Sequence, residues 1–489
     1  MSYQQKLPSN ISGSNFLFEL TPIKAWKAIF SFATAVLLSL LVGGIVAVIT
    51  FPLGSLALAW LLYRRYPLFY CSFTWWMWLV GPLVRRIIDF RCGYITPGPW
   101  FLTPALVTSL SIVTLLKHFP KAHKQGGLPF VVAAACCLYG YLLSLIDIGF
   151  SDQVIVIFLS WLVPICFGFH ISVHWQDYPD YRQNIQRTFL WGVLFMGFYG
   201  IVQYVFAPPW DCFFLVELMN GGSSGNSSSF GIPEPFGIRV FSSMISPQGF
   251  AATMTAGLIL LFCIQGNQQL LAGGFGYLSL LLSLARSAWL SWIVSTLVFF
   301  RSLKYNMQIR MVIGMLVTAL IILPVTTIEP FSTAISDRTA SLSNTDGDRS
   351  YQVRLEGFNK LIDHALVQFV GLGINNPVTP NVDAKKDFVI GDNGILLILF
   401  ALGWIGGLPY VLSMVILIFQ IRQTCLKNSD LALHAFYAVI IGLVSQIFFK
   451  VITDGTMAMI LWGFIGIGMS AHNYYSFESK LQNSSNRLR

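Results

Sequence analysis

The sequence predicts an all-α protein, a polytopic bundle of roughly 12–14 transmembrane helices with one large outer-face loop that contains an amphipathic helix. Of the 489 residues, 55% are hydrophobic and only 10% are charged, and the mean hydropathy is +0.67. Apolar runs of about 20 residues, the length that crosses a bilayer as a helix, recur along the chain. This composition excludes a soluble globular domain and makes the lipid bilayer the first expected partner.

Apolar runs along the whole chain are the candidates for these spans. They cover residues 29–49, 51–63, 67–84, 100–116, 128–146, 153–173, 188–206, 246–264, 270–284, 287–301, 308–328, 393–420, 432–452 and 456–472. The second, ninth and tenth runs are short enough to be re-entrant segments, which is why the expected number of spans is a range.

Lysine and arginine in short loops favour the cytoplasmic side of a membrane, and they place the N-terminus inside. The basic residues of the inside loops and the C-terminal tail are Arg64, Arg65, Lys117, Lys121, Lys124, Arg182, Arg187, Arg301, Lys304, Arg310, Arg422, Lys427, Lys480, Arg487 and Arg489. Arg85, Arg86 and Arg91 break the pattern, because they follow a span on the outer side. We attribute most of the net charge of +9 to this bias, and we expect no nucleic-acid partner.

This orientation divides the chain into seven segments. They are a cytoplasmic N-terminal tail (1–28), an N-terminal transmembrane bundle (29–206), an outer loop (207–245), spans with a membrane arginine (246–328), a large outer loop (329–392), C-terminal spans (393–472) and a cytoplasmic tail (473–489). In the large loop, apolar residues recur at helical spacing between Arg349 and Leu366. We expect an amphipathic helix there, lying on the membrane surface or closing over the bundle.

Arg286 is the most informative single residue of the sequence. It is the only charged residue between Phe275 and Phe300, within an otherwise apolar stretch. A guanidinium group cannot lose its charge, and burying it at membrane depth costs at least about 2.5–3.5 kcal/mol. Such a residue is usually functional, with an anionic partner, although a structural pair with a carboxylate is the alternative.

Four arginines fall on the predicted outer side: Arg239, Arg286, Arg338 and Arg354. Arginine offers phosphate a planar fork of donors, so several arginines together suit a diphosphate. Taken singly, Arg338 and Arg354 also fit solvated loop charges, and Arg239 fits an interfacial side chain that reaches toward water. The cysteines and histidines show no metal-ligand spacing, so we expect neither a metal site nor a cofactor.

Acidic residues supply the other half of a candidate site. Asp392-Asn393 opens the apolar run that follows the large loop. Both residue types favour the N-cap of a helix, but Asp392 could also act as a general base that deprotonates an acceptor hydroxyl. Asp348 is a weaker candidate base, because it lies in a polar run typical of a turn.

Four stretches in this order resemble the O-antigen ligase and Wzy-type polymerase superfamily of bacterial envelope enzymes, over roughly residues 235–420. They are Gly237-Ile-Arg-Val-Phe-Ser-Ser-Met-Ile-Ser-Pro247, Leu282-Ser-Leu-Ala-Arg-Ser-Ala-Trp289, Asp348-Arg-Ser-Tyr-Gln-Val-Arg354, and Gly371-Leu-Gly373 followed by Asp392-Asn393 and Gly403-Trp-Ile-Gly406. Residues 1–230 resemble the family only as generic spans.

The resemblance implies a metal-independent glycosyltransferase of the bacterial inner membrane, with its active site on the periplasmic side. The enzyme would transfer a glycan from an undecaprenyl-diphosphate donor to a sugar hydroxyl during O-antigen or exopolysaccharide assembly. Its partners would be the undecaprenyl-diphosphate-linked oligosaccharide, a glycan acceptor, and a chain-length regulator or export proteins. The implied catalytic residues are Asp392, Arg286 and Arg239, and the implied substrate-binding residues are Arg338, Arg354, Asp348 and Asn393.

One departure from the family pattern bears on the type of activity. Ligases typically have histidine before asparagine at the position where this chain has Asp392-Asn393. The substitution favours a polymerase-like or exopolysaccharide role over a ligase. A transporter of a small anion or a lipid-linked sugar is the competing class, but the sequence lacks the internal repeats that transporters often have.

Overall fold

The protein is helical throughout the part of the chain that its computed structural model describes. The described residues are 23–94, 99–120, 122, 126–220, 230–264, 266–326, 329, 362, 367–374, 393–448, 451–453 and 455–487. They contain no β-strand, only an isolated bridge between Gly231 and Ile238. The all-α fold predicted from the composition is therefore confirmed.

The helices differ widely in length. Those before the first outer loop are α1 (Ile23–Val42), α2 (Gly44–Arg65), α3 (Pro67–Cys92), η1 (Pro99–Leu102), α4 (Thr103–Ser109), α5 (Ser111–His118), α6 (Leu128–Asp147), α7 (Asp152–Val173), η3 (Trp175–Asp177) and α8 (Tyr178–Phe206). Those that follow are α9 (Pro209–Asn220), α10 (Pro247–Leu261), α11 (Asn267–Leu282), α12 (Arg286–Ser302), α13 (Tyr305–Thr326), α16 (Gly394–Lys427), α17 (Leu431–Val444) and α18 (Gly455–Arg487).

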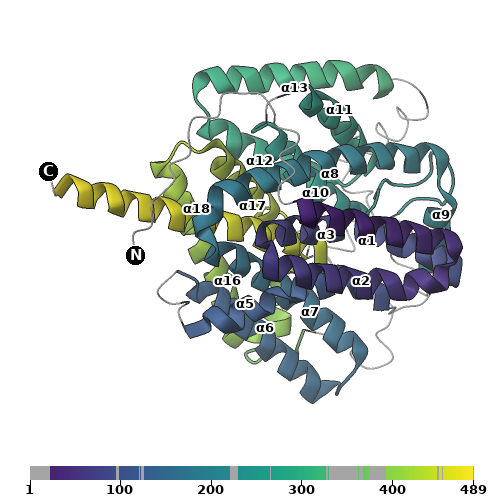
Figure 1. The fold of residues 1–489 in the computed structure, drawn as a ribbon, viewed down its shortest axis with the longest axis horizontal. Coiled ribbons are helices and arrows are strands. Elements are labelled where there is room, and N and C mark those ends of the chain that lie inside the picture. The colour runs from purple at the N-terminus through teal and green to yellow at the C-terminus, as the bar shows by residue number, and fades with distance from the viewer. Residues whose placement is uncertain are drawn as a thin grey trace.

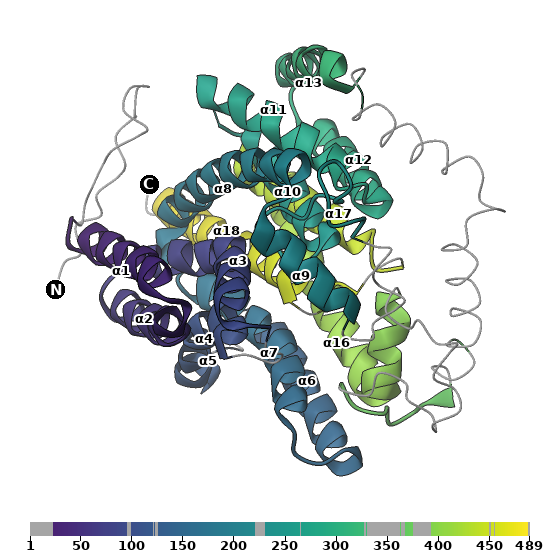
Figure 2. The same cartoon turned by 90° about the vertical axis from the view of Figure 1, so that its right-hand side faces the viewer.

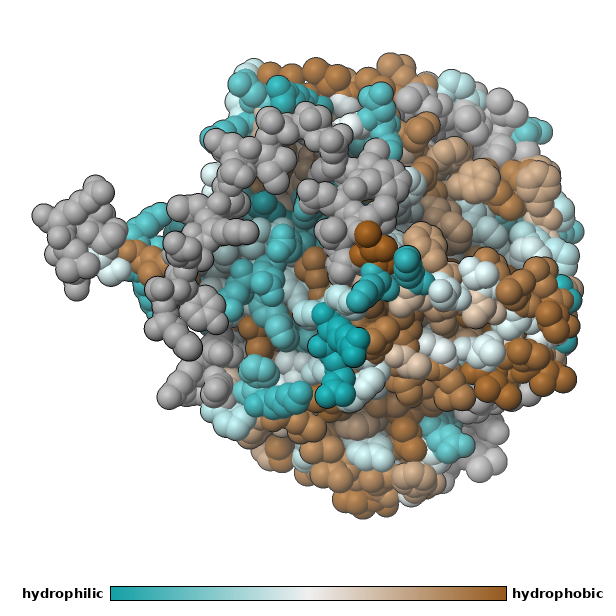
Figure 3. Space-filling view, viewed as in Figure 1, coloured by the Kyte–Doolittle hydropathy of each residue, from teal (hydrophilic) through white to brown (hydrophobic). Residues whose placement is uncertain are grey.

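The described helices give the protein a multi-pass membrane architecture. Eight helical segments are long and apolar enough to cross a bilayer, and α10 and α17 are shorter apolar helices. Figure 1 shows α1, α2, α8, α13 and α18 running in the same general direction. Figure 3 shows apolar residues over most of the same face, with hydrophilic residues toward the end from which α18 emerges.

The first two helices differ from the predicted runs. The sequence places the break between residues 49 and 51, next to Pro52, whereas the structure places it at Gly43. Pro52 lies inside α2, so the second run is the later part of a 22-residue helix rather than a short re-entrant segment. Hydropathy cannot locate such a break, because both sides of it are equally apolar.

Close contact between α7 and α18 forms the centre of the bundle. A Cβ atom on Gly168 of α7 would collide with the carbonyl oxygen of Trp462, and one on Gly466 of α18 would collide with the carbonyl oxygen of Gly168. Glycine lets the two backbones touch, as small residues do between helices in membranes. The Trp462 ring is fully buried beside this crossing, between Phe130 and Tyr410.

Loops and helix ends gather at two opposite ends of the bundle. We call one the arginine end, and it is formed by residues 85–94, 204–215, 230–246 and 282–289. Backbone hydrogen bonds join these segments: Phe236 N donates to Tyr204 O at 2.7 Å, and Val240 N donates to Leu282 O at 3.1 Å. We call the other the histidine end, and it is formed by residues 63–67, 114–118, 170–178 and 469–477. The rings of Trp175 and Phe477 are in contact there, with their centroids 5.2 Å apart. Figure 1 shows α9 on the right and the last part of α18 on the left, and Figure 2 looks onto the end that carries α9.

Two glycine positions explain why residues 369–373, within the predicted large loop, pack against α16. Gly403 has φ of +61° at a kink inside α16, and Gly371 has φ of +91°. Cβ atoms on either residue would meet the backbone of the other segment. Leu372 N donates to Phe400 O at 3.0 Å and Gly373 N donates to Ala401 O at 2.9 Å across this contact. The two glycines thus form a backbone packing contact between the two segments.

Gly403→Ala should lower the thermal unfolding midpoint of the purified protein. The conformation of Gly403 is nearly exclusive to glycine, and the new methyl group would collide with the Phe369 carbonyl oxygen. Gly407→Ala in the same helix is the matched control, because its nearest neighbour is the end of the Leu399 side chain at 3.2 Å. Equal midpoints for the two variants would contradict the account of this contact.

Candidate functional site

Arg286 is the first residue of α12 and lies at the arginine end, half-buried. The turn before it contains Leu284, whose φ of +53° is unusual for a branched side chain. Ala285 occupies the N-cap position and offers no side-chain acceptor to the first amide groups of the helix. Arg286 is therefore a positively charged residue at the helix end where the dipole is also positive.

Arg239 joins this turn from a segment far away in the sequence. Its Nη2 donates to the carbonyl oxygen of Leu284 at 2.8 Å, across 45 positions of the chain. Beside this bond, Val240 N donates to Leu282 O at 3.1 Å, so the backbone of the Arg239 segment is bonded to the same turn. The two predicted arginines thus belong to one local structure.

The segment that carries Arg239 is fixed by its backbone on both sides. Arg239 N donates to Phe230 O at 2.9 Å. The side-chain oxygen of Gln203 in α8 accepts from Phe241 N at 3.0 Å and from Ser242 N at 2.7 Å. Buried amide groups need such acceptors, because an unsatisfied buried amide costs about 1–3 kcal/mol.

A buried ion pair lies beneath this segment and connects α3 with α9. Arg86 is 1% exposed and pairs through Nη1 with Oδ1 of Asp211, which is 0% exposed. Its Nη2 donates to the carbonyl oxygen of Ser242. Asp211 Oδ2 also accepts from Tyr199 OH and from Gln203 Nε2, both at 2.8 Å. Burial raises the pKa of the Asp211 carboxyl, and the Arg86 charge is the largest influence that opposes this rise.

Buried acidic partners explain two of the three basic residues that broke the positive-inside pattern. α3 continues to Cys92, beyond the predicted end of its span at residue 84, so Arg85 and Arg86 are inside a helix and buried. Arg85 Nε bonds with Asp89 at 3.2 Å, and Asp89 also accepts from Trp100 Nε1 at 2.6 Å. Both arginine charges are therefore compensated locally and carry little information about orientation.

Asp211→Leu should strongly lower the thermal midpoint of the protein in detergent. The change leaves the buried Arg86 charge without its acid, and breaking a buried pair in this way costs about 3–5 kcal/mol. Adding Arg86→Met to Asp211→Leu removes the stranded charge and should restore part of the loss. The interpretation fails if the single and the double variant unfold at the same temperature.

Several helices begin at the arginine end and direct their N-termini toward it. Ser246 caps α10 by accepting from Gly249 N at 3.1 Å, and Gly249 packs beside Thr456 near the start of α18. Asn393 caps α16 by accepting from Leu396 N at 3.1 Å. With α12, these helices bring positive dipole ends to one end of the bundle, an arrangement that favours anions.

The structure assigns the N-cap of α16 to Asn393, one of the two residues for which the sequence predicts capping. The amide of Gly394 donates to Ile447 O at 2.7 Å and ties the start of α16 to the end of α17. The remaining predicted site residues, Asp392, Arg338, Arg354 and Asp348, lie outside the described residues. So does the predicted amphipathic segment 349–366, apart from residue 362.

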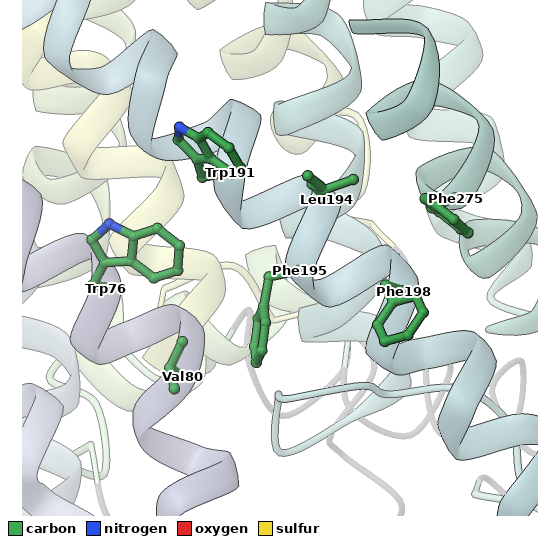
Figure 4. A pocket seen from close by; sticks show the side chains of 7 residues that line it. All are labelled: Trp76, Val80, Trp191, Leu194, Phe195, Phe198 and Phe275. Carbon is green, nitrogen blue, oxygen red and sulfur yellow. The ribbon is translucent and has the colours of Figure 1, made fainter. Parts of the chain in front are cut away.

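An apolar groove of about 570 Å³ opens on the side of the bundle between α3, α8 and α11. Figure 4 shows the side chains that line it: Trp76, Val80, Trp191, Leu194, Phe195, Phe198 and Phe275. Beyond Phe198 in α8, Gly200 contacts Val240 and Ser279. The groove therefore lies on the flank of α8, and the same helix leads from it to the segment of Arg239.

Sequence reasoning missed the Arg86, Gln203 and Asp211 network, although each residue interrupts an apolar run as Arg286 does. The free-energy cost of a polar or charged side chain in an apolar run, which singles out Arg286, also singles out Gln203 and Asp211. Sequence reasoning also missed His170 and His174, whose four-residue spacing places both on one face of α7 and its C-terminal turn.

Comparison with known proteins adds no assignment for this arrangement. No protein-family model matches the chain, and no curated protein is significantly similar to it. Among the described residues, no group of three histidine, cysteine or acidic side chains is placed to hold a metal ion. The geometry of the arginine end is therefore the basis for assigning a function.

Proposed function

We propose that the protein is a membrane glycosyltransferase of the O-antigen ligase and polymerase type. It would transfer a glycan from undecaprenyl diphosphate to a sugar hydroxyl at the arginine end of the bundle. In this proposal that end faces the periplasm of a bacterium, and the product is O-antigen or exopolysaccharide. The order of motifs between residues 235 and 420 supports the family, and the aspartate before Asn393 favours the polymerase type.

The observation that carries the proposal is the bond from the Arg239 guanidinium to the carbonyl oxygen of Leu284, two residues before Arg286. It brings two arginines from separate motifs to one turn at the start of α12. Arginine is suited to a diphosphate, because its planar donors match phosphate oxygens. The N-termini of α10, α12 and α16 add to the attraction for an anion.

The rigidity of the segment that carries Arg239 is the second support for the proposal. A catalytic cation stabilises developing charge best when its position is fixed before the reaction, because no reorganisation is then needed. The Arg239 segment is bonded to Gln203, to Leu282 and, through Ser242, to the buried Arg86. Such a segment can hold a guanidinium group in place at the boundary of the membrane.

The apolar groove on α8 offers a place for the lipid part of the donor. A polyprenyl chain is a long hydrocarbon, and aromatic walls such as Trp76 and Phe195 bury it without requiring polar partners. In this proposal the chain lies along α8 while the diphosphate reaches the turn at Leu284. The groove then orients the donor, and the arginines bind its charged group.

The proposed reaction follows from these placements. The acceptor hydroxyl attacks the anomeric carbon of the donor glycan and forms a new C–O bond. The bond from that carbon to the diphosphate oxygen breaks, and undecaprenyl diphosphate leaves with the electron pair, stabilised by Arg239 and Arg286. Asp392 accepts the proton of the attacking hydroxyl. Arg338, Arg354 and Asp348 would bind the substrate, and Asn393 would hold the start of α16 beside the base.

Arg286→Ala should abolish glycan transfer when the purified protein is reconstituted with a lipid-linked oligosaccharide. Arg286→Lys should recover only a small part of the activity, because lysine lacks the planar fork of donors. The readouts are longer glycans and released undecaprenyl diphosphate. Arg301→Ala is the matched control, since Arg301 is an exposed arginine at the other end of the same helix.

Normal glycan length with the Arg286 variants would refute the role of this arginine. A wild-type protein that moves the lipid-linked sugar across the vesicle membrane without lengthening it would instead support the transporter class. Both outcomes can be read in the same vesicles, because transfer changes the glycan and transport does not.

Asp392→Asn tests the proposed base. Asparagine keeps the size and the capping ability of aspartate but does not accept a proton near neutral pH. We expect the turnover of the reconstituted enzyme to fall by at least about a hundredfold, the low end of what a general base contributes. Full turnover would leave Asp392 with only a structural part in the start of α16.

A further inference from the structure

A second cavity lies at the histidine end, on the side of the bundle opposite the proposed donor site. Its volume is about 340 Å³. The side chains that line it come from α2, α3, α5, α7 and the C-cap of α7, and they are Tyr63, Arg64, Pro67, Thr114, Lys117, His118, His170 and His174. The proposed transfer reaction uses none of these residues, so the cavity calls for its own explanation.

His170 forms the buried wall of this cavity and is only 1% exposed. Its Nδ1 shares a hydrogen bond of 2.7 Å with Thr114 Oγ1, which in turn bonds with Tyr63 OH at 2.8 Å. The rings of Tyr63 and Tyr70 pack against it at 5.6 and 5.3 Å. Nε2 of His170 is buried and finds no hydrogen-bond partner among the described residues. A buried polar atom in this state costs about 1–3 kcal/mol, which a ligand in the cavity would recover.

The lining of the cavity is basic. Arg64 and Lys117 are exposed at its rim, and the ring of His174 lies 4.6 Å from that of His170. Among the described residues, no acidic side chain lines the cavity. Asp177 follows His174 in the chain and is close enough to interact with it electrostatically, but it lies outside the lining. The cavity therefore suits a negatively charged ligand.

A metal ion fits this lining less well. His174 Nδ1 bonds with the carbonyl oxygen of His170 at 2.8 Å, so this nitrogen faces the backbone. The described part of the chain contains no arrangement of three histidine, cysteine or acidic side chains that could bind a metal. Arg64 and Lys117 would repel a cation, whereas both donate hydrogen bonds to an oxyanion.

We propose that this cavity binds a phosphate group, with Nε2–H of His170 donating to one phosphate oxygen and Arg64 and Lys117 donating to others. The arrangement that makes Nε2 a donor has Tyr63 donating to Thr114 and Thr114 donating to Nδ1. The phosphate belongs either to the headgroup of an anionic phospholipid or to free phosphate. Arg64 extends over the face of Trp60 at 5.4 Å, and tryptophan is enriched at the level of lipid headgroups.

The two possible sources of the phosphate can be distinguished by adding two ligands to the purified protein in neutral detergent and measuring its thermal midpoint with each. One is inorganic phosphate, and the other is a short-chain phosphatidylglycerol, with short-chain phosphatidylcholine as its zwitterionic comparison. Stabilisation by phosphatidylglycerol alone identifies a lipid headgroup site, and stabilisation by inorganic phosphate identifies a site for the free anion. If neither addition raises the thermal midpoint above its value with phosphatidylcholine, the proposal is wrong.

The double variant Arg64→Gln/Lys117→Gln tests whether the stabilising ligand binds in this cavity. Both residues are exposed, so the double change should leave the fold intact, as the thermal midpoint without ligand will show. Losing two charged donors should weaken binding of the stabilising ligand by at least about tenfold. Arg301→Gln removes an exposed charge outside the cavity and should leave the affinity unchanged. Equal affinity for the double variant and the wild type would overturn the assignment.

Discussion

The buried pair between Arg86 and Asp211 holds the arginine end of the protein together. It joins α3 to α9, and the second donor group of Arg86 reaches the carbonyl oxygen of Ser242. Gln203 completes the contact by accepting from two backbone amides of the same segment. A buried ion pair contributes little stability by itself, because desolvation offsets its attraction. Its importance here lies in fixing the segment that carries Arg239.

The turn before α12 connects the fixed Arg239 segment with the candidate site. Leu284 has a left-handed backbone conformation, and its carbonyl oxygen accepts from Arg239. Arg286 follows as the first residue of α12, at the positive end of the helix dipole. Arginine offers phosphate oxygens a planar fork of donors, so two arginines from one turn suit the proposed diphosphate.

Much of the architecture could be predicted from the sequence, because lipid allows little besides helices to cross a membrane. The all-α class, the multi-pass character and the cap at Asn393 follow from composition and local pattern. The break at Gly43 and the length of α3 did not follow, since hydropathy averages over neighbouring residues. Arg85 and Arg86 were assigned to a loop because their acidic partners, Asp89 and Asp211, are recognised only once the helices are packed.

The site itself was predictable in part. The cost of burying an arginine in an apolar run singled out Arg286, and the motif order singled out Arg239. Their meeting at Leu284 depends on a hydrogen bond across 45 positions, which no local pattern encodes. The histidine cavity was missed for a related reason. Its lining comes from four helices, and only the spacing of His170 and His174 is visible in the sequence.

The most direct test of the central claim is the affinity of the purified protein for farnesyl diphosphate, a soluble prenyl diphosphate, measured by calorimetry. If Arg239 and Arg286 hold the diphosphate, replacing either one with glutamine should weaken binding by at least about tenfold. Farnesyl monophosphate should bind the wild type less tightly than the diphosphate. Unchanged affinity in both variants would mean that the two arginines serve the fold and not a pyrophosphoryl lipid.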